Sequence, residues 1–157
     1  PFLRQRDSAG SLQCGRCSVT SPCEMPLLPV LSEGVRLRSV LHQLWAASAA
    51  VELMGGTPKQ CLDAASTVLM NMLGLVCDPV GGLVEYPCQN RNAAGVANAL
   101  IAAEMSLAGI PQLIPFDEML EAMYKVGKRL PVELRETALS GCATTPSACE
   151  ACRVHEL

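Results

Sequence analysis

Two cysteines, Cys77 and Cys88, stand at the two ends of a segment that is rich in glycine and proline. Gly81 and Gly82 can adopt backbone angles closed to other residues, so the chain can pass close to a bulky group. Soft thiolates held by such a loop suit zinc or an iron–sulphur cluster. Their spacing is no known zinc signature, and free cysteine is often a small buried hydrophobe. The spacing therefore leaves a metal site and a pair of buried thiols equally open.

Arg91 and Asn92 follow the second cysteine, where the next helix is predicted to begin. A guanidinium at a helix start can pair with the carboxylate of a substrate, so both residues are candidate substrate contacts. The alternative is that Arg91 anchors the loop through hydrogen bonds. Within the loop, Asp78 and Glu85 are expected to have capping or solvated roles rather than metal-side ones.

Nine cysteines in 157 residues are far above the average count and point to metal, redox work or buried thiols. Cys14-x-x-Cys17 and Cys149-x-x-Cys152 together resemble the half-sites of a zinc ribbon, which would make the chain a binding module clasped at its termini. Their separation is far beyond the usual zinc spacing. Cys142 is expected to be an ordinary thiol.

The elements that position these residues are expected to be helices. Alanine, leucine, methionine and valine dominate, and aromatic residues make up only 3% of the chain, a composition that favours close-packed helices over a sheet. Thr57 can cap a helix, Pro58 suits its first position, and Gln60 completes a capping box. Asp117 can cap a later helix. The helical segments are predicted at residues 36–54, 57–73, 92–108 and 117–129, with a short turn of helix within 131–139.

The sequence thus predicts an all-α fold, a small helical domain with the cysteine-bearing loop between two core helices. Residues 1–34 are rich in serine, proline, glycine and cysteine without a helical period, which predicts an irregular or disordered arm. Residues 35–140 form the helical domain, and residues 141–157 are expected to be a loose tail.

Charge and hydropathy exclude several classes of function. The net charge is −3 and the basic residues form no patch of the kind that holds nucleic acid. The apolar stretches are interrupted by polar residues, so no membrane span is predicted. No signal peptide is visible, which makes the cytoplasm the expected location. The first residue is not methionine, so the chain is expected to begin inside a longer protein.

Several separated blocks closely resemble the alpha-chain signature of bacterial iron–sulphur-dependent L-serine dehydratases. The resemblance covers about three fifths of the chain, roughly residues 49–146, and corresponds to the C-terminal part of that alpha chain. The blocks appear in the family's order, at residues 55–58, 73–84, 87–88, 91–93, 115–118, 123–128 and 134–139.

The resemblance implies a lyase that converts L-serine to pyruvate and ammonia without pyridoxal phosphate. In that family three cysteines hold a [4Fe–4S] cluster, and the open iron acts as a Lewis acid on the substrate. Cys77 and Cys88 match two of the three ligands. The family also implies a beta chain or beta domain as partner, and a homo-oligomer is possible. No residue here matches a known catalytic base, and the preference between serine and threonine stays open.

The chain departs from the family pattern upstream of the blocks. Counting back without gaps places the third cluster cysteine near Val35, where the sequence does not resemble the family. The family's glycine- and threonine-rich active-site segments are also missing. Two alternatives to an active enzyme therefore stand: a catalytically inactive helical fragment of it, and the zinc-clasped binding module.

Overall fold

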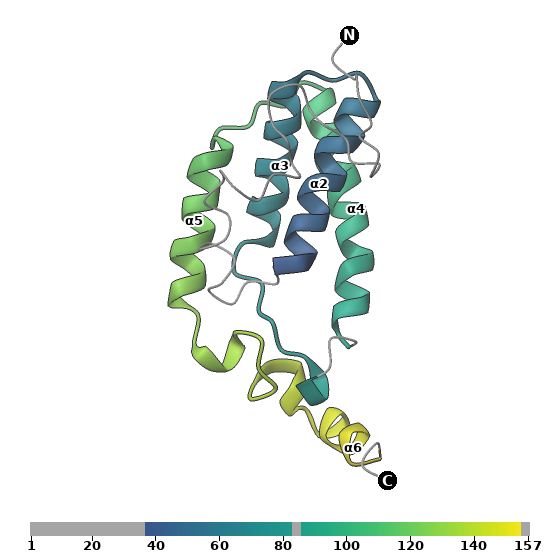
Figure 1. Ribbon diagram of the computed structural model, residues 1–157, viewed down its shortest axis with the longest axis vertical. Helices are drawn as coiled ribbons and strands as arrows, with labels where there is room; N and C mark the ends of the chain where they lie inside the picture. The colour runs from purple at the N-terminus through teal and green to yellow at the C-terminus, as the bar shows by residue number, and fades with distance from the viewer. Residues whose placement is uncertain (1–36, 83–85, 155–157) are drawn as a thin grey trace, which may run out of the picture.

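The computed structural model describes residues 37–82 and 86–154 (Figure 1). Within these ranges the chain forms helices and no strand, which confirms the all-α prediction. The predicted arm at residues 1–34 lies outside the described residues. The helices are α2 (Leu37–Leu53), α3 (Pro58–Met72), α4 (Cys88–Leu107), α5 (Phe116–Arg129) and α6 (Pro146–Val154), with short 3-10 turns η1 (Val80–Gly82), η2 (Val132–Leu134) and η3 (Gly141–Thr144).

Four helices make an up-and-down bundle in which α2, α3 and α4 pack against one another and α5 packs on α3 (Figure 1). Helices α2 and α4 run in the same direction, so their N-terminal ends lie at the same end of the bundle. Small side chains such as Ala99 and Ala103 let the helix axes approach closely. The largest fully buried apolar side chains are Leu69, Met119, Met123, Val40, Val51 and Val68.

The start of α3 is the predicted capping box. The backbone N–H of Gln60 donates to Thr57 Oγ1 at 3.3 Å, and the backbone N–H of Thr57 donates to Gln60 Oε1 at 2.9 Å. Pro58 occupies the first helical position, where its missing N–H costs nothing. Gln60 also ties α3 to the end of α4, because its Nε2 donates to the carbonyl of Ser106 at 3.0 Å.

Replacing Thr57 by alanine is expected to lower the free energy of unfolding by about 1 kcal/mol, because the backbone N–H of Gln60 loses the hydroxyl oxygen that accepts its hydrogen bond. Urea denaturation followed by circular dichroism measures this loss. Thr57→Ser keeps the hydroxyl and is the matched control, expected to stay within about 0.5 kcal/mol of the parent. Equal losses in both variants would show that the cap does not stabilise the helix.

Three boundaries differ from the predictions. Helix α4 begins at Cys88, not at residue 92, and α5 begins at Phe116 with Pro115 preceding it, so Asp117 lies in the first turn instead of capping it. Residues 141–154, expected as part of a loose tail, form η3 and α6. Ala143 and Ala148 are buried there, and α6 packs against η1. Residues 141–154 are folded because they contact a part of the chain that is distant in sequence, and local sequence patterns do not report such contacts.

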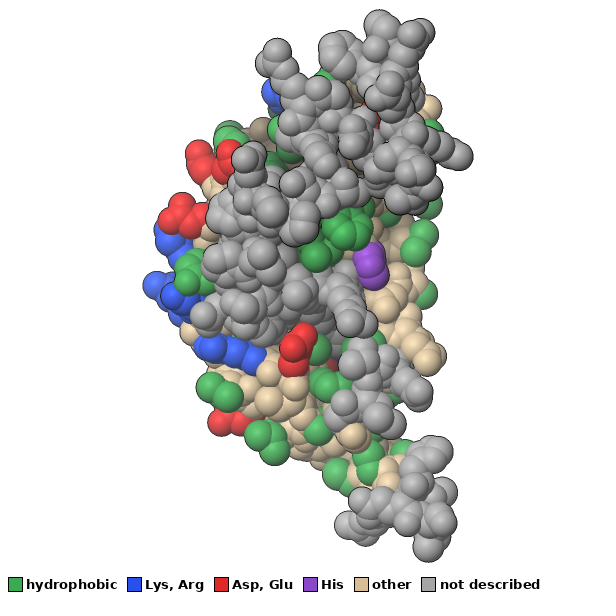
Figure 2. Space-filling view, viewed as in Figure 1, with side chains coloured by type: hydrophobic (Ala, Val, Ile, Leu, Met, Phe, Trp, Pro, Cys, Tyr) green, Lys and Arg blue, Asp and Glu red, His purple; other side chains and the backbone are tan. Residues whose placement is uncertain are grey.

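Helix α5 carries its charges in the order that the helix dipole favours. Asp117 and Glu118 lie in its first turn, and Lys128 and Arg129 lie in its last turn. In Figure 2 the red and blue side chains gather on the flank of the molecule formed by this helix. Lys128 Nζ lies 4.3 Å from the centre of the Tyr124 ring. These basic residues thus have local roles that stabilise the helix.

Glu52 on α2 is a buried acid, 7% exposed, whose Oε1 has no hydrogen-bond partner in the part of the chain that the structure describes. Desolvation by burial raises the pKa of Glu52 above its ordinary value. The folded state therefore binds a proton more readily than the unfolded state at this site. The resulting penalty is present at neutral pH and is relieved as the pH falls through the folded-state pKa.

Glu52→Gln is therefore expected to raise the free energy of unfolding at pH 7, and the advantage should shrink as the solution is acidified. Urea denaturation of the parent and the variant across the acid range measures this difference. A matched control is Glu104→Gln on the exposed face of α4, for which no such gain is expected. An advantage of Glu52→Gln that grows on acidification would contradict the assigned cause.

No helix among the described residues is long and apolar enough to cross a membrane.

Candidate metal-binding loop

The loop that begins at Cys77 and leads into α4 lies at the lower end of the bundle, beside α6 (Figure 1). Cys77 is 7% exposed and Cys88, the first residue of α4, is 5% exposed. The backbone N–H of Cys77 donates to the carbonyl of Leu134 at 3.0 Å, and the N–H of Val80 donates to the carbonyl of Tyr86 at 3.0 Å. The backbone thus holds the loop on both sides of the Gly81 turn, which has a φ of +63°.

Asp78 is the buried centre of this loop, with a side chain only 2% exposed. Its Oδ1 pairs with Arg91 Nη1 at 2.6 Å, and its Oδ2 accepts the backbone N–H of Cys142 at 2.7 Å. Arg91 Nη1 also donates to the carbonyl of Val76 at 3.2 Å. One carboxylate therefore connects the loop, the first turns of α4 and the C-terminal segment, and Asp78 is buried and paired, not solvated.

Gly141 makes this connection possible. Its φ is +66°, and a Cβ added there would lie 2.3 Å from Asp78 Oδ2. A side chain at this position would therefore displace the carboxylate. The neighbouring Cys142 carries the N–H that Asp78 binds, so glycine and the following cysteine together form the seat for Asp78.

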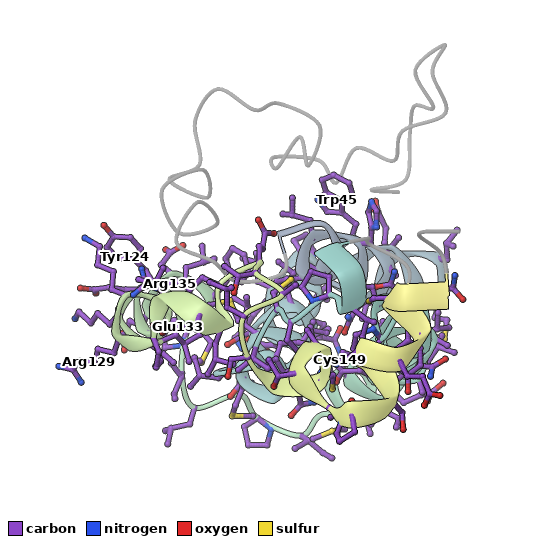
Figure 3. The ribbon with its side chains drawn as sticks, turned by 90° about the horizontal axis from the view of Figure 1, so that it is seen from below. Trp45, Tyr124, Arg129, Glu133, Arg135 and Cys149 are labelled. Carbon is purple, nitrogen blue, oxygen red and sulfur yellow. The ribbon has the colours of Figure 1, made fainter. Side chains whose placement is uncertain are left out.

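The C-terminal segment brings two further thiols beside the loop. Cys142 Sγ lies 3.8 Å from Arg91 Nη2. Cys152 Sγ lies 3.1 Å from where a Cβ on Gly81 would stand. Figure 3, seen from below, shows α6 crossing this end of the bundle, with Cys149 on it. Cys149 is exposed, and its thiol lies 3.8 Å from the carbonyl of Ala143. No sequence pattern pointed to these contacts, because they depend on how the tail folds back.

The donor chemistry of the loop fits two ligands of a metal centre. Cys77 and Cys88 are buried thiols, and neither forms a disulfide with another described cysteine. Within residues 37–82 and 86–154 no group of three or more His, Cys, Asp and Glu side chains could hold a metal ion. Val35, where the family's third ligand falls, lies outside the described residues, as do Cys14 and Cys17. Cys77 and Cys88 are therefore not part of a group of three metal-ligating side chains among the described residues.

Arg91 and Asn92, the two candidate substrate contacts, lie in different surroundings. Arg91 is committed to Asp78 and the loop, although its side chain is still 29% exposed. Asn92 is exposed and lines a pocket between α2 and α4, together with His42 and Gln43. The sequence had given no reason to single out Gln43.

Comparison with known proteins identifies the family to which a chain with this fold and this loop belongs. The family described as "Serine dehydratase alpha chain" matches residues 45–143. The match spans more than half of the chain and includes the loop, its two cysteines and the Asp78–Arg91 pair. The chain therefore belongs to the serine dehydratase alpha chain family.

Among curated proteins, the chain is 58% identical over 105 residues to the "Probable L-serine dehydratase, alpha chain" of Bacillus subtilis (strain 168), covering 67% of this chain and 35% of that protein. It is 56% identical over 98 residues to the "L-serine dehydratase, alpha chain" of Peptoniphilus asaccharolyticus, covering 62% and 34%. It is 39% identical over 106 residues to "L-serine dehydratase 2" of Escherichia coli (strain K12), covering 67% and 23%. The chain thus spans about a third of the length of each of these two alpha chains.

Proposed function

We propose that this chain is the C-terminal part of the alpha chain of an iron–sulphur-dependent L-serine dehydratase, which converts L-serine to pyruvate and ammonia. The observation that carries the proposal is the placement of Cys77 and Cys88. Both matched cysteines are buried at the ends of one loop, and the buried Asp78 carboxylate connects that loop to Arg91 of α4 and to the backbone of Cys142. Relatives at 58% and 56% identity that bear the name of this enzyme support it.

In this proposal Cys77 and Cys88 are two thiolate ligands of a [4Fe–4S] cluster. When bound, the cluster supplies a Lewis acid that polarises the serine hydroxyl and carboxylate. Asp78 and Arg91 keep the loop in place, so the two sulphurs stay fixed relative to α4. Arg91 and Asn92 are proposed as contacts of the substrate, Arg91 through the nitrogens that do not bind Asp78. The catalytic base is not assigned to any residue of this chain.

The proposal requires further polypeptide. In the proposal the third thiolate comes from outside the described residues, the family's beta chain or beta domain is the partner, and the cytoplasm is the location. The same family membership supports two further parts of the proposal, an enzyme without pyridoxal phosphate and a homo-oligomeric assembly.

A second candidate is a helical fragment that is inactive on its own. It is favoured by the finding that, among the described residues, no group of three or more His, Cys, Asp and Glu side chains could hold a metal ion. Anaerobic incubation of the full chain with iron and sulphide, followed by a serine-to-pyruvate assay, separates the two. Turnover by the chain alone would contradict the inactive fragment.

The enzyme proposal is tested by restoring the missing upstream region. A chimera joins the preceding part of the Bacillus subtilis alpha chain to residues 45–157 of this chain, and it is assayed with the matching beta chain after anaerobic reconstitution. We expect pyruvate formation within about tenfold of the intact Bacillus subtilis enzyme treated alike, since that enzyme and this region are 58% identical. A folded chimera that produces no pyruvate while the intact enzyme does would contradict the proposal.

A further inference from the structure

Helix α4 has an exposed side that carries almost no charge. The helix packs against α2 and α3 and lies at the edge of the bundle opposite α5 (Figure 1). From residue 92 to residue 103 it has no charged residue, although seven of these twelve positions are exposed. Six of the exposed residues are apolar, and together they are called the apolar face of α4: Ala93, Ala94, Val96, Ala97, Leu100 and Ile101.

Helix α5 shows how a solvent-facing helix of this chain differs. Every exposed residue of α5 is charged, and its buried residues lie on the opposite side. On the apolar face of α4, by contrast, Val96 is 61% exposed, Ile101 is 56% exposed and Leu100 is 53% exposed. A helix that is apolar on all sides is typical of a position enclosed by other elements. The composition of α4 therefore indicates a further polypeptide that covers its exposed side.

The polypeptide that the family has and this chain lacks would enter the bundle beside this face. The family match begins at residue 45, inside α2, and the chain covers 35% of the Bacillus subtilis alpha chain. In the proposed function the remaining polypeptide precedes this region, so it joins the bundle through the first half of α2. The N-terminal ends of α2 and α4 lie at the same end of the bundle (Figure 1). The upstream polypeptide therefore enters next to α4.

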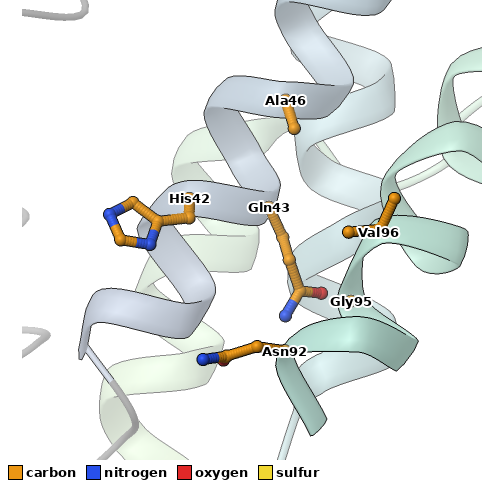
Figure 4. A pocket seen from close by; sticks show the side chains of 6 residues that line it. All are labelled: His42, Gln43, Ala46, Asn92, Gly95 and Val96. Carbon is orange, nitrogen blue, oxygen red and sulfur yellow. The ribbon is translucent and has the colours of Figure 1, made fainter. Parts of the chain in front are cut away.

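A pocket of about 300 Å³ between α2 and α4 connects this point of entry with the apolar face (Figure 4). Val96 of the apolar face forms its wall on α4, and Ala46 lies on α2. An apolar side chain of a covering segment can enter such a pocket. Three of the six residues of the apolar face are alanine, so another helix can approach the axis of α4 closely. The lining residues are His42, Gln43, Ala46, Asn92, Gly95 and Val96.

We infer that the apolar face of α4 is the docking surface for a helix from the upstream part of the same alpha chain. In the complete alpha chain this helix covers Val96, Leu100 and Ile101. The inference rests on the proposed function, because it takes the covering polypeptide from that alpha chain. It needs neither a cluster nor a substrate, since apolar burial alone holds the two surfaces together.

The test compares Leu100→Glu in the full chain of 157 residues with Leu100→Glu in the chimera that carries the upstream part of the Bacillus subtilis alpha chain. Urea denaturation followed by circular dichroism is measured without iron, sulphide or beta chain. In this chain the new carboxylate stays in water, so the urea midpoint should fall by no more than about 0.3 M. In the chimera the carboxylate is buried without a partner, and the midpoint should fall by about 1 M or more.

Leu113→Glu is the matched control, because Leu113 is 91% exposed and lies outside α4. It should shift the midpoint equally in the two chains. If the Leu100→Glu chimera does not fold, Leu100→Ala serves instead. That variant should lower the midpoint by about 0.5 M more in the chimera than in this chain, because it leaves a cavity only where Leu100 is covered.

Three results would overturn the inference. The first is an equal midpoint shift from the Leu100 variant in the two chains. The second is a dimer of this chain that Leu100→Glu converts to a monomer in size-exclusion chromatography with light scattering, since a second copy would then cover the face. The third is a larger shift in the chimera that appears only after the beta chain is added. An inactive chimera contradicts the proposed function but leaves these midpoints measurable, so the two failures are distinguishable.

Discussion

Arg91→Met is expected to lower the free energy of unfolding by about 3 kcal/mol, because it leaves a buried carboxylate without its ion-pair partner. Asp78 is 2% exposed in its side chain and lies 2.6 Å from Arg91 Nη1. Methionine keeps much of the apolar stem of arginine, so the loss of charge dominates the change. Urea denaturation followed by circular dichroism measures the loss.

The matched control is Lys59→Met on α3. Lys59 pairs with Asp63 at the same distance, 2.6 Å, but its side chain is 78% exposed. Ion pairs in water contribute about 0–1 kcal/mol, so this variant should stay close to the parent. If Arg91→Met loses no more stability than Lys59→Met, the Asp78–Arg91 pair does not hold the loop.

Gly141→Ala is expected to cost about 2–4 kcal/mol, through backbone strain and through overpacking against Asp78. The φ of Gly141 is +66°, and the added Cβ would lie 2.3 Å from Asp78 Oδ2. The carboxylate would have to move, which weakens its bonds to Arg91 and to the N–H of Cys142. Urea denaturation again gives the magnitude.

Gly109→Ala separates the two causes. Gly109 has a φ of +77°, but no atom lies within 4 Å of where its Cβ would stand. This variant therefore carries the backbone strain alone, about 1 kcal/mol. The difference between the two alanine variants reports the contact with Asp78. Equal losses would mean that the seat for Asp78 tolerates a methyl group.

Much of the helical bundle could be predicted from the sequence, because its signals are local. The capping box at Thr57 and Gln60 satisfies helix-end donors within one turn, and with Pro58 these residues suffice to locate the start of α3. The sequence predicts the start of α4 four residues late, since Pro87 and Cys88 resemble loop residues. Helix α6 was missed because its order depends on contacts with η1, which are distant in sequence.

The residues of the candidate site likewise fall into those that the sequence predicts and those that it does not. Loop composition and the family resemblance single out Cys77 and Cys88, because both cysteines belong to one short segment. The connection from Asp78 to Cys142 joins residues 64 positions apart, and no periodicity or motif reports such a pairing. Gln43 reads as an ordinary polar residue of a helix, and only its burial and its unpaired Nε2 distinguish it.

The central claim is that Cys77 and Cys88 are ligands of an iron–sulphur cluster. The most direct measurement is the iron and acid-labile sulphide content of the reconstituted chimera and of its Cys77→Ser, Cys88→Ser and Cys61→Ser variants. Cys61 is the matched control, since it is 5% exposed but belongs to the core cluster of the bundle. We predict about four irons per chain in the parent and in Cys61→Ser, and loss of the cluster in the other two. Undiminished iron and sulphide in Cys77→Ser or Cys88→Ser would contradict the claim.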